Sequence, residues 1–132
     1  MGNATATAVK TAIVILSDPG AGSEEALGRL FNGLAVAHEF KQRGDDVQIL
    51  FQGTGTRWLS HLTRSDHPAH ALFETVKDAV VGASSGCANV FGAANDVRQA
   101  GFELIDDYAL PGTSGMPSLR SLIGGGFSVL TF

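Results

Sequence analysis

The only cysteine of the chain, Cys87, is the side chain best suited to covalent chemistry. Small residues at 81–87 predict a strand that ends at the thiol, and the amphipathic pattern after it predicts a helix that ends at Gly101. At the start of a helix, backbone N–H groups lack intrahelical partners and the helix dipole is positive. Both features stabilise a thiolate, which is the nucleophilic form of cysteine. Cys87 is therefore a candidate reactive thiol, with an unreactive cysteine packed in the core as the alternative.

The residues that follow Cys87 are the first candidates to assist it. We expect the backbone N–H groups of Ala88, Asn89 and Val90 to stabilise a charged sulfur. The side-chain amide of Asn89 can add one more hydrogen bond. No histidine or lysine lies near Cys87 in the sequence, so a Cys–His protease arrangement has no local support.

Residues 82–86 match the G-x-S-x-G spacing that surrounds the nucleophilic serine of α/β-hydrolases. In those enzymes the acidic residue and then the histidine follow the serine along the chain. Here every histidine precedes Ser84: His38, His61, His67 and His70. We therefore reject this motif and interpret its small residues as a packing requirement.

A loose cluster of His61, Asp66, His67 and His70 contains residue types that bind zinc. His67 and His70 are three positions apart and can share one face of a helix. Their spacing is not diagnostic of a metal site, so we predict no bound metal. A small metal-dependent enzyme that uses His61, His67 and His70 remains an alternative hypothesis.

Gly53 and Gly55 begin the G-x-G-x-x-G pattern of a dinucleotide site, but Trp58 occupies the position of its third glycine. We expect a loop rather than a helix after these glycines. The turn at residues 18–23 has no lysine of the kind that binds phosphate in nucleotide-binding loops. The sequence therefore predicts no nucleotide cofactor, although anion binding at a helix N-terminus stays open.

The composition is typical of one globular domain of 132 residues, with 44% apolar and 17% charged residues. The net charge of −4 disfavours nonspecific binding to nucleic acid or to anionic membranes. No apolar run reaches the roughly 18 residues that span a bilayer. A single cysteine forms no internal disulfide, and the first residues lack the pattern of a secretory signal. We therefore expect a cytoplasmic protein with no membrane partner.

Alternating strand and helix patterns predict a three-layer α/β domain with a mostly parallel, five-stranded sheet. We expect a disordered N-terminus at residues 1–8 and one domain at residues 9–132. The predicted strands are residues 9–16, 47–51, 81–87, 102–108 and 127–132. The predicted helices are residues 24–43, 68–80, 88–101 and 118–123, with an irregular stretch at 52–66. Ser23, followed by Glu24 and Glu25, is the expected start of the first helix.

Ligands of open parallel sheets bind beyond the carboxyl ends of the strands. This topology brings the ends of several predicted strands to one edge of the sheet, beside Cys87. The candidate ligand-binding residues at this edge are Ser17, Asp18, Gln52, Trp58, Ala88 and Asn89. For Trp58, coverage of the core or of a subunit interface is the alternative.

The chain resembles the DsrE/DsrF-like family of sulfur-relay proteins, which includes the Tus sulfur carriers. The resemblance rests on the order of four features: a buried strand that runs into Ser17-Asp18-Pro19-Gly20, a helix that ends at Arg43-Gly44, Cys87 after the third strand, and a final strand at 127–132. It spans residues 10–132. It implies a parallel sheet in the strand order 4-3-2-1-5 and a homo-oligomer, as a dimer, trimer or hexamer.

The resemblance also implies a function for Cys87. Family members that move sulfur carry a persulfide on the cysteine at this position, so we expect a sulfur carrier that accepts sulfur from a donor protein and passes it to a partner thiol. The alternative is a non-catalytic, oligomeric protein that binds a small ligand or serves as a scaffold. The aromatic residues Phe51, Trp58 and Phe91, together with the lack of an acid–base pair, motivate that alternative.

Overall fold

Five parallel strands form one sheet in the order β4-β3-β2-β1-β5 in this computed structural model, which describes residues 8–132. The strands are β1 (Lys10–Ile15), β2 (Asp46–Phe51), β3 (Val80–Ser84), β4 (Leu104–Ile105) and β5 (Ser128–Thr131). The predicted parallel sheet and its strand order are confirmed. Of the segment 1–8 that we expected to be disordered, only Ala8 lies within the described residues.

The central strands are buried on both faces, as near-continuous apolar strands of a parallel sheet must be. On one face, Ile13 and Ile15 of β1 join Ile49 and Phe51 of β2 in the main hydrophobic core. Alternate residues of the same strands point to the other face, where Val14 is also buried. Both faces of the sheet therefore need a cover.

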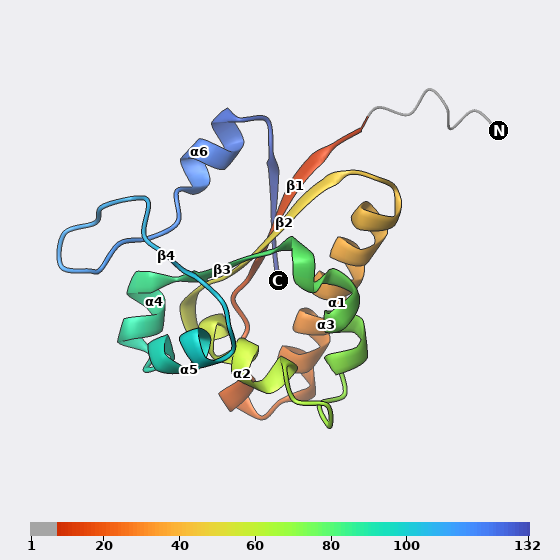
Figure 1. The fold of residues 1–132 in the computed structure, drawn as a ribbon, viewed down its shortest axis with the longest axis horizontal. Coiled ribbons are helices and arrows are strands. Elements are labelled where there is room, and N and C mark those ends of the chain that lie inside the picture. Colours follow the sequence, from red (N-terminus) through yellow and green to blue (C-terminus); the bar gives the residue numbers. More distant parts are fainter. Residues whose placement is uncertain (1–7) are drawn as a thin grey trace.

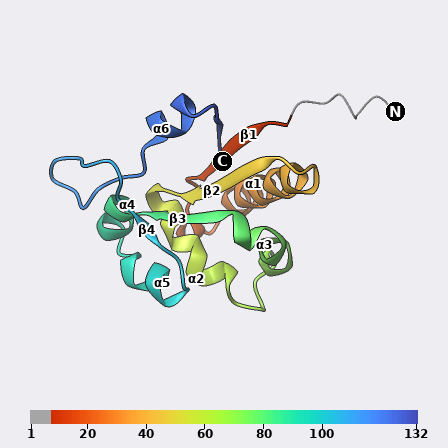
Figure 2. The same cartoon turned by 45° about the horizontal axis from the view of Figure 1, so that its top comes forward.

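Most helices cover the face of the main core, and one covers the other (Figure 1). Helices α1 (Glu24–Gln42), α2 (Trp58–Leu62), α3 (His70–Val76) and α5 (Ala94–Gln99) lie on the core side, and α6 (Leu119–Gly124) lies on the opposite side (Figure 2). Helix α4 (Ser85–Val90) sits at the carboxyl end of β3. Short 3-10 turns complete the chain as η2 (Pro19–Ala21), η3 (Gly53–Arg57) and η4 (Lys77–Ala79). Among residues 8–132, no helix combines the length and the apolar character that crossing a bilayer requires.

The first helix is the element that local sequence signals specify best. The Oγ atom of Ser23 accepts a hydrogen bond from the N–H of Ala26 at 3.1 Å, as an N-cap residue does. After Arg43, Gly44 adopts a positive φ of 78° and ends the helix. The predicted boundaries of this helix and the predicted start signal at Ser23 are confirmed.

Three predicted element boundaries are wrong for identifiable reasons. The expected strand 81–87 ends at Ser84, because the Ser84 side chain caps a helix that begins at Ser85. The expected helix 88–101 is two helices, because Gly92 between them takes a φ of 72°. The expected helix 68–80 gives way to η4, and Val80 pairs with Ile49 as the first residue of β3.

The structure also corrects the expected stretch 52–66 and the expected strand 102–108. The stretch 52–66 is irregular only in its last four residues: η3 and α2 follow β2 directly, so a helical segment does open at the two glycines. A Cβ atom at Gly55 would collide with the carbonyl oxygen of Ile15, which accounts for a glycine there without any nucleotide. The expected strand 102–108 pairs with β3 only at Leu104 and Ile105, after which the chain leaves the sheet in a long loop (Figure 1).

Candidate functional site

Cys87 lies in the first turn of α4, at the carboxyl edge of the sheet, and its side chain is half-buried. The strand runs into this helix without a loop, because the Oγ atom of Ser84 accepts a hydrogen bond from the N–H of Cys87 at 3.2 Å. Ser84 itself is fully buried and also donates to the sulfur of Met116 at 3.4 Å. The backbone at the thiol is therefore held by the last residue of β3.

Two first-turn amides, those of Gly86 and Cys87, already have hydrogen-bond partners, which corrects the expected surroundings of the sulfur. The N–H of Gly86 donates to the carbonyl of Gly115 at 2.7 Å, and the N–H of Cys87 donates to Ser84. The amides of Ala88, Asn89 and Val90, which we expected to stabilise the sulfur, lie further along the helix, where N–H groups bond to carbonyls four residues back. Stabilisation of a thiolate has to come from side chains or from the helix dipole.

Small residues let α4 pack closely on the segment 113–116. A Cβ atom at Gly86 would lie only 2.8 Å from the sulfur of Met116. The side-chain amide of Asn89 donates to Ser114 Oγ at 2.6 Å, and Ser85 Oγ lies 2.7 Å from the same oxygen. The predicted site residue Asn89 thus ties α4 to this segment.

The face of α4 that carries the thiol also carries exposed apolar surface. Residues three and four positions apart share a helix face, which places Val90 and Phe91 beside Cys87. Val90, the last residue of α4, is 72% exposed. A partner protein that docked here would cover Val90 and reach the thiol.

An arginine that the sequence gave no reason to select lies close to this surface. The Nε of Arg57 donates to the carbonyl of Phe91 at 3.2 Å, and its guanidinium stands 5.7 Å from the centre of the Phe91 ring. Its Nη1 lies 3.4 Å from Oδ1 of Asp18, a predicted site residue. Arg57 therefore connects the loops after β1 and β2 to the end of α4, one helical turn from Cys87.

The remaining predicted residues divide between core and edge. Trp58 is almost completely buried, and its indole N–H donates to the carbonyl of Ser17 at 2.7 Å. Ala88 is also fully buried. Asp18 remains partly exposed and accepts a hydrogen bond from the N–H of Gly20 at 2.8 Å. Gln52 lies at the end of β2 on the other side of the sheet, where it lines a pocket with residues of the loop before α6.

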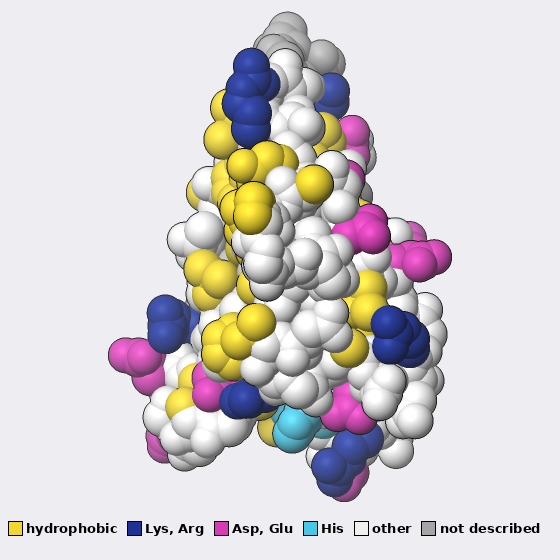
Figure 3. Space-filling view, turned by 90° about the vertical axis from the view of Figure 1, so that its left-hand side faces the viewer, with side chains coloured by type: hydrophobic (Ala, Val, Ile, Leu, Met, Phe, Trp, Pro, Cys, Tyr) yellow, Lys and Arg dark blue, Asp and Glu magenta, His cyan; other side chains and the backbone are white. Residues whose placement is uncertain are grey.

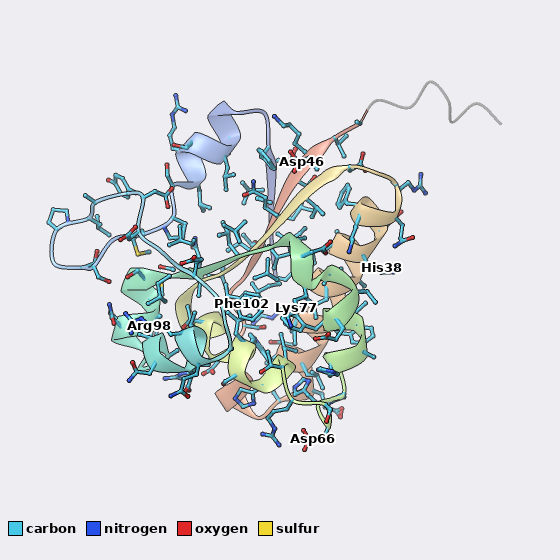
Figure 4. All side chains as sticks on the ribbon, in the orientation of Figure 1. His38, Asp46, Asp66, Lys77, Arg98 and Phe102 are labelled. Carbon is cyan, nitrogen blue, oxygen red and sulfur yellow. The ribbon has the colours of Figure 1, made fainter. Side chains whose placement is uncertain are left out.

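The histidines do not gather into a metal site within residues 8–132. Nδ1 of His70 pairs with the carbonyl of Leu62 at 2.8 Å, and Asp66 pairs with Arg64. The side chain of Asp66 points outward at the lower end of the molecule (Figure 4). Instead, His61 and His67 pack edge-on against the ring of Trp58, with ring centres 6.3 Å and 6.0 Å away.

Burial lowers the pKa of His67 below its usual value, and nearby His61 and Arg64 act in the same direction. Its Nδ1 accepts a hydrogen bond from the N–H of Ala69 at 3.0 Å, an arrangement that requires Nδ1 to carry no proton. His67 therefore acts as a neutral cap for the chain that enters α3.

Comparison with known proteins finds a relative whose name states no activity. Over 101 residues the chain is 29% identical to the uncharacterized protein MJ0733 of Methanocaldococcus jannaschii, a match that covers 76% of this chain and 78% of that protein. No family model and no solved structure matches the chain significantly. That relative has no stated activity, so a function has to be argued from the geometry of the site.

Proposed function

We propose that this chain is a sulfur carrier that holds sulfane sulfur as a persulfide on Cys87 and passes it to a partner thiol. The observation that carries the proposal is a lone, half-buried cysteine in the first turn of a helix at the carboxyl edge of a parallel sheet. Edges of this kind are where open α/β sheets bind their substrates. The resemblance to DsrE/DsrF-like proteins supports the same function.

The transfer needs only a thiolate and no external oxidant. The Cys87 thiolate attacks the outer sulfur of a donor persulfide, R–S–SH, and forms a new S–S bond as the donor S–S bond breaks. The products are Cys87–S–SH and the donor thiolate R–S⁻. A partner thiolate then attacks the outer sulfur of the Cys87 persulfide, which regenerates the Cys87 thiolate. The chemistry requires an accessible sulfur and a modest positive potential, and requires no general acid–base pair.

Two neighbours suit these requirements. The guanidinium of Arg57, held over Phe91, supplies positive charge one helical turn from the thiol. The exposed side chain of Val90 supplies an apolar contact for a docking protein on the same face of α4. Donor and acceptor are therefore expected to be proteins rather than nucleic acid or membrane, in keeping with the net charge of −4. A persulfide carrier belongs in a reducing compartment, for which we propose the cytoplasm.

Homo-oligomer formation is a further part of the proposal. Strand β5 pairs with β1 on one edge only, and no described strand pairs with its other edge. Leu130 on this strand is 39% exposed, and Ile123 on the preceding helix is 59% exposed. An unpaired edge with exposed apolar side chains is commonly covered by another chain. Sedimentation velocity at several concentrations measures the assembly.

The carrier function is tested by loading the protein with sulfur. The protein is incubated with a low-molecular-weight persulfide, desalted and measured by intact mass spectrometry under non-reducing conditions. We expect the mass to rise by one sulfur atom in the natural sequence and in Asn89→Ala, and to stay unchanged in Cys87→Ser. A dithiol should remove the added sulfur. No gain of sulfur, or an equal gain in Cys87→Ser, would reject the proposal.

The second candidate is an oligomeric scaffold without thiol chemistry, and the hydrogen bonds already made by the N–H groups of Gly86 and Cys87 favour it. It predicts that native Cys87 reacts with an alkylating reagent no faster than the same cysteine in the denatured chain. A carrier predicts faster native alkylation at neutral pH. Comparing the two rates in one buffer series decides between the candidates.

A further inference from the structure

A pocket of about 470 Å³ lies between the end of β2, the loop before α6 and the start of α6. This volume is in the range of small-molecule sites, about 300–1,000 Å³. Cys87 is not among its lining residues, so it is separate from the thiol site. The lining residues are Gln52, Tyr108, Leu110, Met116, Pro117, Ser118, Leu119 and Arg120.

Gln52 provides the pocket with a polar side chain that pairs with no described residue. Its backbone is fully used, because its N–H donates to the carbonyl of Ile15 and its carbonyl accepts from Gly55. The residue is only 9% exposed and lines the pocket, and its side-chain amide makes no hydrogen bond within residues 8–132. Among residues 8–132, no fully enclosed side-chain N or O atom lacks a hydrogen-bond partner, so solvent in the pocket reaches this amide. A ligand that pairs with this amide would replace that solvent while keeping the hydrogen bonds of the amide.

The other side chains that line the pocket are mainly apolar, and they include a thioether and an aromatic ring. Leu110, Met116 and Leu119 contribute aliphatic and thioether groups, and Tyr108 contributes an aromatic ring. Thioether sulfur and aromatic rings both make favourable contacts with aromatic groups. Tyr108 and Met116 are joined by backbone hydrogen bonds of 2.8 Å and 2.9 Å, which fix these two walls relative to each other.

The pocket offers little to a charged ligand. Arg120 is its only charged lining residue, and its Nη1 lies against Gly124, one turn along its own helix. The Oγ of Ser118 is occupied, since it donates to Ser121 Oγ and accepts from the N–H of Ser121. Figure 3 shows hydrophobic patches and uncharged atoms over the middle of this side of the molecule, with charged side chains mainly toward its margins.

We propose that this pocket binds an uncharged, planar aromatic molecule that has a hydrogen-bond donor and an acceptor side by side, as in a lactam or an aromatic amide. The side chain of Gln52 has the matching pair, an NH₂ donor and a carbonyl acceptor. The ring of the ligand lies against Tyr108, Met116 and Leu119. Cys87 does not line this site.

The bicyclic lactam isoquinolin-1(2H)-one is the probe that tests the site. Its N-methyl derivative keeps the ring and the carbonyl but loses the donor. Binding is followed by ¹H–¹⁵N NMR titration of the full chain, with Tyr108 and Leu119 as reporters. We expect a Kd of about 1 mM or lower for the lactam and weaker binding of the N-methyl derivative by roughly tenfold.

Two variants distinguish a hydrogen bond between the probe and Gln52 from nonspecific apolar binding to this face of the sheet. Gln52→Leu keeps the size of the side chain and should weaken lactam binding by roughly tenfold, with little effect on binding of the N-methyl derivative. Gln48→Leu is the matched control, because Gln48 lies on the same face of β2 but lines a neighbouring pocket. It should bind the lactam like the natural sequence, as should Cys87→Ser.

Several outcomes would overturn the proposal. Absence of titratable shifts at millimolar lactam would do so, as would equal binding of the lactam and its N-methyl derivative. Equal binding by Gln52→Leu, with native thermal unfolding and NMR spectrum, would also overturn it. The amide NMR signals of Tyr108 and Leu119 could instead shift when the protein is diluted and stay unchanged when the probe is added. That result would show that a second copy of the chain, rather than a small molecule, covers this face.

Discussion

The hydroxyl oxygen of Ser84 accepts a hydrogen bond from the backbone N–H of Cys87 at 3.2 Å, so the last residue of β3 caps the helix that carries the thiol. The same hydroxyl donates to the sulfur of Met116, which lines the pocket beside Gln52. Ser84 thus couples the strand end, the first turn of α4 and the loop before α6. The position of the thiol depends on a side chain that is fully buried.

Replacing Ser84 by alanine should destabilise the fold and release the first turn of α4. The loss of an N-cap costs about 1–2 kcal/mol, and the N–H of Cys87 is left without its partner. We expect a lower urea midpoint and a changed rate of Cys87 alkylation. Ser23→Ala is the matched control: it removes the cap of α1, should cost a similar free energy, and should leave the alkylation rate unchanged. Equal alkylation by Ser84→Ala and the natural sequence would contradict this role.

Glycine at position 55 is predicted to be required by contact with the neighbouring strand. A Cβ atom there would collide with the carbonyl of Ile15, and backbone atoms cannot move aside cheaply. We expect Gly55→Ala to lower the free energy of unfolding by more than about 2 kcal/mol, as overpacking does. Gly28→Ala is its control, because nothing lies within 4 Å of a Cβ atom at this position of α1. That variant should gain up to about 1 kcal/mol from helix propensity. Chemical denaturation of both variants measures the two effects, and a neutral Gly55→Ala would refute the contact argument.

Elements governed by local signals were predictable from the sequence. The apolar strand before Ser17, the cap at Ser23 and the positive-φ glycine at position 44 each act within a few residues, and the structure confirms the elements they bound. Elements governed by distant contacts were not. Gly82 takes a φ of 151° where a Cβ atom would meet the carbonyl of Glu103, a constraint that the composition of 81–87 cannot reveal.

The candidate site divides in the same way. Topology alone placed Cys87 and Asp18 at one edge of the sheet, and the structure places both there. The contact of Arg57 with Phe91 joins residues 34 positions apart, so no pattern in either segment could indicate it. The pocket beside Gln52 likewise combines this residue with a loop more than fifty residues later in the chain. Of the residues that line the pocket, only Gln52 was selected from the sequence.

The stability of the protein should fall as the pH is lowered below about 6.5, the usual pKa of histidine, and His67 should contribute to this fall. The pKa of His67 is lowered in the folded chain by burial and by His61, so the unfolded chain takes up the proton first. Its stabilising effect is therefore complete above the unfolded pKa and is lost as the pH falls toward the folded pKa. Protonation also ends the acceptor role of Nδ1 toward Ala69.

His67→Asn isolates this effect. An asparagine oxygen can accept from the N–H two residues later, so the cap at Ala69 is kept while the titrating group is removed. We expect urea midpoints to depend less on pH in His67→Asn than in the natural sequence, between about pH 7.5 and about pH 5. The same slope in His67→Asn and the natural sequence would show that His67 does not contribute.

Arg57 and Asp18 should change the reactivity of Cys87 in opposite directions. The guanidinium of Arg57 stands over Phe91, one turn from the thiol, while the carboxylate of Asp18 lies 3.4 Å from Nη1 and offsets part of its charge. Arg57→Gln should therefore slow alkylation by the anion iodoacetate more than by neutral iodoacetamide, by roughly twofold, and Asp18→Asn should favour iodoacetate. Both ratios should approach that of the natural sequence at high salt, because exposed charges are screened. Arg43→Gln removes a positive charge at the end of α1 and should leave the ratio unchanged. Shifts of the same sign in Arg57→Gln and Asp18→Asn would mean that local packing, rather than the electrostatic potential at Cys87, governs access to the thiol.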